Sequence, residues 1–461
     1  MLRLTLAAAA AALLALSACT TAPAASLAPE APQQAGLAVD IYEGNFVRIQ
    51  QFTTPGGVSV WLVNEPSIPI LSVQMAWRGG SITDPDDLRG LTSLVTYSMN
   101  EGAGDLDSLA FTTAMEELNM SFGCSASSEW TGCSATMLSD NAAASMDLVA
   151  LAFAEPRFDT GPFERFRREQ EVSLRTRETN QNFLAGRAFA AKLYPDHPFA
   201  RELTAETLAA LTPELARAHM QTLMPRDRLI VTAVGAVTPE ELAPLIDSVA
   251  ANLPETSEIA PVAPVTLPEV APEPTIVPLP QPQTLVRFMA GGIDRNNPDY
   301  FPAFVLNYTF GGGGFESRLV KSLRVEKGLT YGISTSLSPN LSFLSWSGGG
   351  QTKNESAGEF IEGIKVEMLG LIEGGVTEAE LSDAKAYLVG SYPLAFDSNA
   401  KIAGQMMSVR QEDLGIDFFD RRNALIEAVT LEDVNRVAAR YLAPERFAFV
   451  LVGEPVLTPA E

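Results

Sequence analysis

A cluster of prolines divides this 461-residue chain near its middle. The prolines recur at short intervals between Leu253 and Thr284, at Pro254, Pro261, Pro264, Pro268, Pro272, Pro274, Pro278, Pro280 and Pro282. Because proline fixes φ and lacks an amide hydrogen, such a segment can form neither the interior of a helix nor a central strand. The sequence therefore predicts an extended linker over residues 254–283, flanked by two regions of ordinary domain size.

The two flanking regions share one pattern of apolar runs. In the first region, strands are predicted over residues 58–63, 70–77 and 228–235. In the second region, strands are predicted over 284–292 and 446–453, with a helix over 299–310. This parallel predicts an internal duplication with domains at 41–253 and 284–455. Each domain is expected to be α+β, a largely antiparallel sheet with helices packed on it.

Residues 1–18 have the composition of an export signal. A short basic start is followed by a run rich in Ala and Leu, too short to span a membrane, that ends in Leu16-Ser17-Ala18-Cys19. This ending resembles the lipobox of bacterial lipoproteins, which implies cleavage before Cys19 and lipidation of its thiol; the alternative is an ordinary signal that leaves a free cysteine. With a flexible tether over 19–40, we expect an exported, periplasmic lipoprotein anchored to the membrane.

Export also affects the reading of the two remaining cysteines, because an oxidising compartment permits disulfides. Cys124 and Cys133 flank a segment that can turn at Ser128-Glu129. A hairpin there would place the two cysteines opposite each other, within reach of a disulfide. We predict that bond; the alternative is two small buried thiols.

Composition excludes several functions. Two histidines and three cysteines cannot build a metal site rich in His or Cys. A net charge of -24 disfavours nucleic acid as a partner, because phosphate binding depends on clustered Lys and Arg. The same charge would either steer basic peptides or simply form a solvated acidic surface. The serine-hydrolase motif G-x-S-x-G is absent.

Several segments together resemble a known family. They are Pro55-Gly56-Gly57-Val58, Gly90-Leu91, Tyr194-Pro195-Asp196-His197-Pro198-Phe199, Ser317-Arg318-Leu319 and Leu323-Arg324-Val325-Glu326-Lys327-Gly328-Leu329-Thr330-Tyr331-Gly332. The chain resembles the insulinase/pitrilysin zinc metallopeptidases, also called inverzincins, and especially the short bacterial members related to mitochondrial processing peptidase. The resemblance implies two homologous α+β domains joined by a linker. It also implies that two such chains close around a peptide.

The zinc motif of this family is missing from the chain. The family carries H-x-x-E-H on the helix expected here after Asp84, with Asp84 as cap and Pro85 in the first turn. In that motif two histidines on one helix face bind zinc and the glutamate activates water. Alignment on Gly90-Leu91 places Ser93, Thr96 and Tyr97 at the motif positions. We therefore predict no catalytic residue and no metal in this chain.

Another part of the family machinery is retained. In the family, an arginine and a tyrosine spaced like Arg324 and Tyr331 bind the substrate backbone and help to stabilise the tetrahedral intermediate. A guanidinium and a phenol suit this role as hydrogen-bond donors. We expect the helix 317–323 to support Arg324. The alternative is that Arg324 pairs near Glu326 and Tyr331 merely opens a strand.

These residues predict a subunit that is inactive alone. The leading hypothesis is a substrate-binding subunit of a heterodimeric zinc metallopeptidase, whose homologous partner supplies the zinc. The rival is a peptide-binding or scaffold lipoprotein without a role in proteolysis, and an independently active enzyme ranks last. The only histidines, His197 and His219, are expected to be structural.

Overall fold

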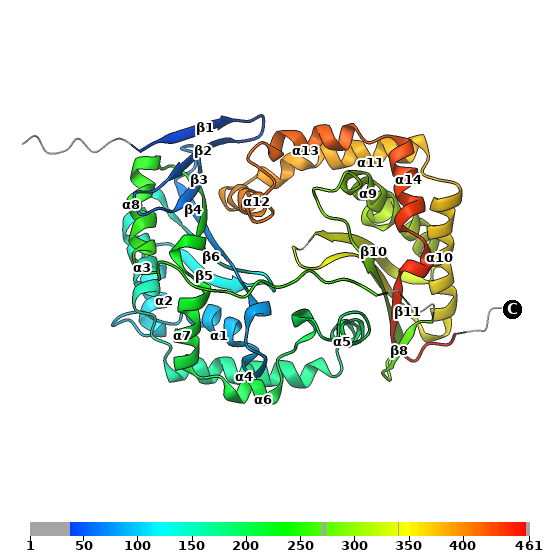
Figure 1. The fold of residues 1–461 in the computed structure, drawn as a ribbon, viewed down its shortest axis with the longest axis horizontal. Helices are drawn as coiled ribbons and strands as arrows, with labels where there is room; N and C mark the ends of the chain where they lie inside the picture. Colours follow the sequence, from blue (N-terminus) through cyan, green and yellow to red (C-terminus); the bar gives the residue numbers. More distant parts are fainter. Residues whose placement is uncertain (1–36, 269, 271–272, 340, 458–461) are drawn as a thin grey trace, which may run out of the picture. The chain divides into compact units, whose positions relative to one another are not determined.

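The computed structural model describes residues 37–268, 270, 273–339 and 341–457. Its first half forms a seven-stranded sheet in the order β1-β2-β3-β7-β4-β6-β5 (Figure 1). The strands are β1 (Val39–Glu43), β2 (Arg48–Thr53), β3 (Ser59–Asn64), β4 (Ile70–Arg78), β5 (Ser121–Ala126), β6 (Trp130–Leu138) and β7 (Ile230–Gly235). Neighbouring strands pair antiparallel, except that β3 and β7 are parallel.

The second half repeats this plan in a five-stranded sheet. Its strands are β8 (Thr275–Pro278), β9 (Gln283–Gly291), β10 (Thr330–Pro339), β11 (Leu344–Lys353) and β12 (Ala448–Gly453). The order β8-β12-β9-β11-β10 matches β3-β7-β4-β6-β5, and β8 and β12 are parallel as β3 and β7 are. The predicted duplication and the α+β class with largely antiparallel sheets are confirmed. The β1–β2 hairpin is an addition to the first sheet.

The predicted linker differs from the structure at its C-terminal end. Strand β8 lies inside the range 254–283, where only connecting chain was expected. Proline is tolerated in edge strands, which leave one row of backbone groups unpaired. β8 is such an edge, since within the described strands it pairs with β12 alone. In the same way, β1 begins at Val39, inside the predicted tether 19–40.

The helices of the first half, apart from α5, pack on one face of its sheet or on one another. The helices of this half are α1 (Leu91–Ser98), α2 (Ser108–Glu117), α3 (Ala142–Ala154), α4 (Thr160–Arg177), α5 (Gln181–Leu193), α6 (Ala205–Ala210), α7 (Pro213–Leu223) and α8 (Pro239–Ala250). Alternate residues of β4, such as Val73 and Met75, point into this core because successive strand side chains face opposite ways. There they pack with residues of α3 and α8, including Val149 and Ile246.

The second half has an equivalent core, to which all of its helices except α12 contribute. The helices of this half are α9 (Tyr300–Asn307), α10 (Ala357–Glu373), α11 (Glu378–Gly390), α12 (Asn399–Gln411), α13 (Phe418–Glu427) and α14 (Leu431–Tyr441). Phe288 and Trp346 of the sheet pack there with Phe360 of α10 and Val437 of α14. Two π-helical turns, Tyr308–Gly312 and Val320–Glu326, interrupt the chain between α9 and β10.

One helix of each half packs on the sheet of the other half. Met406 and Val409 of α12 contact a cluster that contains Trp61 and Val234 of the first sheet. Arg410 of α12 donates to the carbonyl oxygens of Ser59 and Val231 at 3.0 and 2.7 Å. Reciprocally, α5 lies against the second sheet. Gln181 at its start donates to the carbonyl oxygens of Gln283 and Val452 at 2.8 and 2.9 Å. The two halves are therefore joined by matching helices.

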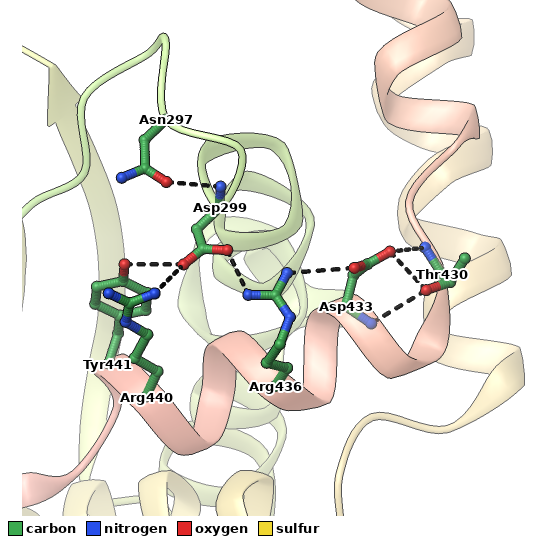
Figure 2. A network of polar contacts seen from close by, with 7 residues as sticks. All are labelled: Asn297, Asp299, Thr430, Asp433, Arg436, Arg440 and Tyr441. Carbon is green, nitrogen blue, oxygen red and sulfur yellow. Dashed lines mark hydrogen bonds and ion pairs between the residues drawn. The ribbon is translucent and has the colours of Figure 1, made fainter.

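A buried carboxylate fixes α9 to α14 in the second half (Figure 2). Asp299, which precedes α9, accepts hydrogen bonds from Arg436, Arg440 and Tyr441, the latter two at 3.0 Å. Burial alone would raise the pKa of Asp299, but the bonds from Arg436 and Tyr441 outweigh it and lower the pKa. The ionised carboxylate is thus the form that stabilises this contact.

The β5–β6 hairpin carries a disulfide. Cys124 and Cys133 are directly opposite each other, with Cα atoms 4.0 Å apart, and their sulfur atoms are bonded. Across the described residues, no helix is both long enough and apolar enough to cross a membrane.

Candidate functional site

Helix α1, which carries the positions of the zinc motif, begins later than expected. Asp84 is followed by a short 3-10 turn, Asp86–Leu88, and α1 starts only at Leu91. The prediction that Pro85 lies in the first turn of this helix is therefore wrong. The physical reason is Gly90, whose φ of 100° redirects the chain into a new helix. Asp84 still stabilises the helix start, since its carboxylate accepts from the amides of Gly90 and Thr92 at 2.9 Å.

The three motif positions hold hydroxyl groups in three different environments. Ser93 is exposed. Thr96 is buried, and its hydroxyl donates to the carbonyl oxygens of Thr92 and Ser93 within the helix, each at 3.2 Å. Tyr97 is half-buried, and its phenol oxygen accepts a hydrogen bond of 2.9 Å from Nε of Arg165 on α4. Two of the three hydroxyls are thus already engaged inside the protein.

Arg165 links Tyr97 to a carboxylate. Its guanidinium also pairs with Glu101, which in turn accepts a 2.6 Å hydrogen bond from Ser108. Burial raises the pKa of Tyr97, although the bond from Arg165 opposes this effect, so the phenol is neutral at physiological pH. Sequence reasoning missed Arg165, because it lies far from the motif along the chain and no local pattern marks it.

These residues do not fit a zinc ion. Zinc is bound in proteins by imidazole, thiolate or carboxylate, and the motif positions supply only neutral hydroxyls. A fixed guanidinium beside Tyr97 would also repel a cation. Among the described residues, no group of three His, Cys, Asp or Glu side chains is arranged to hold a metal.

Both histidines are held by structural contacts. Nε2 of His219 on α7 lies 3.0 Å from the hydroxyl of Thr92 and 3.4 Å from the carboxylate of Asp84. His197 accepts from the amide of Phe199 at Nδ1, and its Nε2 lies 2.8 Å from the carbonyl oxygen of Ala263. These contacts engage Nε2 of His219 and both ring nitrogens of His197 without a metal or a substrate.

The segment Ser317-Arg318-Leu319 anchors the glycine-rich stretch before it. The hydroxyl of Ser317 donates to the carbonyl oxygen of Gly314 at 2.7 Å, and Leu319 is fully buried. Arg318 forms two 2.7 Å hydrogen bonds with the carboxylate of Glu380 on α11 and a third with the carbonyl oxygen of Gly375 at 2.8 Å. The hydrogen bond from Arg318 lowers the pKa of Glu380 to about 2.

Arg324 lies on the π-helical turn Val320–Glu326, where an α-helix was expected over 317–323. The amide of Lys327 donates to the carbonyl oxygen of Ser322 at 3.0 Å, the spacing of a π-turn. No ion pair or hydrogen bond joins the Arg324 side chain to another residue of the described ranges, including Glu326. Instead its guanidinium carbon lies 4.5 Å from the centroid of the Phe315 ring.

Tyr331 is the second residue of β10 and is 86% exposed. The register of β10 against β11 shifts between Thr330 and Ile333, so Tyr331 lies in a bulge of an edge strand. The hydroxyl of Thr330 fixes this bulge by donating to the carbonyl oxygen of Gln351 at 2.6 Å. The backbone that carries Arg324 and Tyr331 is therefore fixed, and no residue of the described ranges accepts a hydrogen bond from either side chain.

The first sheet offers a second polar surface that the sequence did not reveal. Strand β5 is an edge strand, and beside it a cavity of about 340 Å³ lies between the sheet and α12. Its lining includes Gly123 and Ser125 of β5, Ser134 of β6, and Ser408 and Gln411 of α12. Alternation along β5 and β6 would have placed these small residues on one face, but the approach of α12 depends on tertiary packing.

The predicted lipidation site, Cys19, lies outside the described residues.

Comparison with known proteins agrees with this arrangement. The family described as "Insulinase (Peptidase family M16)" matches residues 59–206, and "Peptidase M16 inactive domain" matches residues 210–388. A relative from Helicobacter pylori, named "Non-peptidase homolog YmxG", is 22% identical over 84% of this chain and 89% of its own. The mitochondrial-processing peptidase subunit beta of Lentinula edodes is also 22% identical, over 89% of this chain and 90% of its own.

A solved structure gives the same result for the fold. The crystal structure of a peptidase M16 inactive domain from Pseudomonas fluorescens has a TM-score of 0.83 and 24% identity, and covers 89% of this chain and 100% of its own. The family matches extend over most of the chain, and the sequence contains no H-x-x-E-H motif. This chain belongs to the insulinase family, peptidase family M16, as a non-catalytic member.

Proposed function

We propose that this chain is the substrate-binding subunit of a heterodimeric zinc metallopeptidase, and that a homologous partner carries the zinc. The observation that carries the proposal is a contrast within one chain. Tyr97, at a motif position, is bound to Arg165 and unable to hold metal. Arg324 and Tyr331 instead keep donors that no described residue uses. A protein that had lost every role in peptide chemistry would have no need to keep these donors exposed.

The sheet edge beside α12 supports peptide binding as well. β5 has an unpaired row of backbone groups, because it pairs only with β6 among the described strands. An extended peptide can add to such an edge through main-chain hydrogen bonds. The neighbouring cavity is lined by small polar residues, including Gly123, Ser125 and Ser134, and leaves room for peptide side chains. The disulfide between Cys124 and Cys133 holds β5 to β6 at this edge.

The proposal includes the location of the protein. The signal-like residues 1–18 and the cysteine at position 19 support export to the periplasm and lipidation at Cys19. Mass spectrometry of the membrane fraction tests this part directly. A lipid-modified N-terminal peptide beginning at Cys19 is expected, whereas an unmodified N-terminus would refute the anchor.

The central experiment mixes the purified chain with the homologue from the same genome that retains H-x-x-E-H. We expect a stable complex by size-exclusion chromatography and cleavage of fluorescein-labelled casein that neither chain supports alone. In the complex, Arg324→Ala and Tyr331→Phe should each lower kcat/KM at least tenfold, about 1.4 kcal/mol, without preventing assembly. Tyr387→Phe, which removes another exposed phenol on α11, is the matched control.

The alternative functions give different results in the same assay. A scaffold lipoprotein predicts that the Arg324 and Tyr331 variants behave like the unmodified chain. An independently active enzyme predicts casein cleavage by the purified chain alone. Absence of both association and stimulated cleavage would refute the heterodimer.

A further inference from the structure

An exposed phenylalanine lies beside Arg324. Phe315 belongs to the 3-10 turn Gly314–Glu316, and its side chain is 60% exposed. An apolar ring of this size is usually buried. Within the described ranges the ring contacts the guanidinium of Arg324, whose central carbon lies 4.5 Å from the ring centroid. This distance is well inside the range of a cation–π interaction.

We infer that Phe315 is a positioning residue for Arg324, holding the face of the guanidinium so that its N–H edge points to the peptide. This inference rests on the proposed function, because it assigns a role within the same peptide-binding site. It concerns Phe315 alone and does not require Phe315 to touch the substrate.

The backbone on both sides of this contact is fixed. Gly314 adopts a φ of 57°, a conformation that favours glycine, and its carbonyl oxygen accepts from Ser317. The turn that carries Phe315 is also tied to the π-helical turn that carries Arg324, because Lys321 pairs with Glu316 at 3.0 Å. The ring therefore stands on a supported turn, and among the described residues the Arg324 side chain has no hydrogen bond or ion pair beside its contact with the ring.

A cation–π contact through the face of the guanidinium preserves the chemistry that the proposed function needs. The five N–H donors of arginine lie in the plane of the guanidinium, so contact with its face leaves all of them available. A carboxylate partner would instead occupy the donors, as Glu380 does for Arg318. A stacked arginine also loses less side-chain entropy when a peptide carbonyl or carboxylate binds.

The first measurement tests the contact itself and needs no partner or substrate. In the ¹H–¹⁵N spectrum of the arginine Nε–H groups, the Arg324 signal, assigned by its loss in Arg324→Lys, should be displaced by the ring current of Phe315. Phe315→Leu keeps an apolar side chain but removes the π-face, so the signal should move to the random-coil position. Phe315→Tyr should leave the signal near its original position.

The second measurement tests the consequence in the complex with the zinc-bearing homologue. Phe315→Leu should lower kcat/KM for fluorescein-labelled casein about two- to fivefold, the size of an exposed cation–π interaction. Phe315→Tyr should restore the value, which a merely structural contact would not explain. Phe183→Leu is the matched control, because Phe183 contacts the guanidinium of Arg187 on α5, away from Arg324.

The outcomes separate this inference from the proposed function. If Arg324→Ala lowers kcat/KM and Phe315→Leu does not, the role of Phe315 is refuted while the proposed function stands. If Arg324→Ala has no effect, the proposed function itself fails. If Phe315→Leu leaves the Arg324 signal in place, or Phe315→Tyr does not rescue activity, the inference is overturned.

Discussion

The substitution Glu380→Gln tests how the glycine-rich segment is held. Glu380 accepts two 2.7 Å hydrogen bonds from Arg318, and its carboxylate also accepts from the amide and hydroxyl of Thr377 at the start of α11, both at 2.9 Å. Glutamine removes the charge and replaces one acceptor oxygen by a donor. The substitution should therefore weaken the anchor of the segment that leads to Phe315 and Arg324.

The expected loss follows from the pKa of Glu380. The hydrogen bond from Arg318 lowers that pKa from 4.5 to about 2. A shift of this size corresponds to at most about 3 kcal/mol, and partial exposure reduces it to about 2 kcal/mol. Because the folded pKa is depressed, this stabilisation is complete above about pH 4.5 and is lost as the pH falls toward 2. The difference in free energy of unfolding between the wild type and Glu380→Gln should therefore shrink by more than half from pH 7 to pH 3.

Hydrogen exchange measured by mass spectrometry suits this test, because it reports on one segment of a chain that has two sheets. Peptides covering residues 311–326 should exchange faster in Glu380→Gln at pH 7. Glu241→Gln is the matched control. Glu241 accepts the same pair of bonds from Thr238 at the start of α8, at 2.8 and 3.1 Å, and has no arginine partner in the described part of the chain. If peptides covering residues 311–326 exchange no faster in Glu380→Gln than in Glu241→Gln, Arg318 does not anchor the segment and the reasoning is wrong.

Three further predictions concern other parts of the chain. Asp299→Asn should lower the free energy of unfolding by about 2 kcal/mol at pH 7 in urea titrations, and the effect should diminish as the pH falls below the ordinary pKa of aspartate, because the folded pKa is lowered. Cys124→Ser should lower the free energy of unfolding by about 2 kcal/mol under oxidising conditions and by little in the presence of reductant. Two free thiols in the non-reduced protein would refute the bond to Cys133. A chain with the zinc motif restored in α1 should retain little zinc after dialysis, because the guanidinium of Arg165 repels the ion. The same chain with Arg165→Gln should retain more zinc, measured by plasma mass spectrometry. Equal zinc contents in the two proteins would refute the role of the guanidinium.

Much of the fold was accessible from local sequence. Apolar runs that end in glycine, such as 228–235 and 446–453, marked equivalent strands because both are buried on two faces. Three details depend on interactions between distant residues and were not predicted. The left-handed Gly90 moves the start of α1 beyond Pro85, β8 forms only because β12 is beside it, and α12 packs on the sheet of the other half.

The candidate site, like the fold, could be predicted only in part from the sequence. The spacing of Arg324 and Tyr331, and the missing histidines, could be read directly from the sequence. The neighbours of these residues could not, because periodicity carries no information about contacts such as that of Tyr97 with Arg165 on α4. The contact of Phe315 with Arg324 is closer in sequence, but it depends on a π-helical turn, and no pattern distinguished that turn from an α-helix.

The duplication places the candidate site residues of the two halves at equivalent points of the fold. In both halves the functional positions lie in the same connection, between the second strand of the repeated sheet and the hairpin that follows it. Tyr97 lies in this connection of the first half, and Arg324 lies in it in the second, with Tyr331 at the start of the hairpin. The strands of each sheet are outside the connection, so its exposed residues can change with little effect on the sheet. Tyr97 of α1 is hydrogen-bonded to Arg165 of α4, while Arg324 and Tyr331 of the second half have donors that no described residue uses.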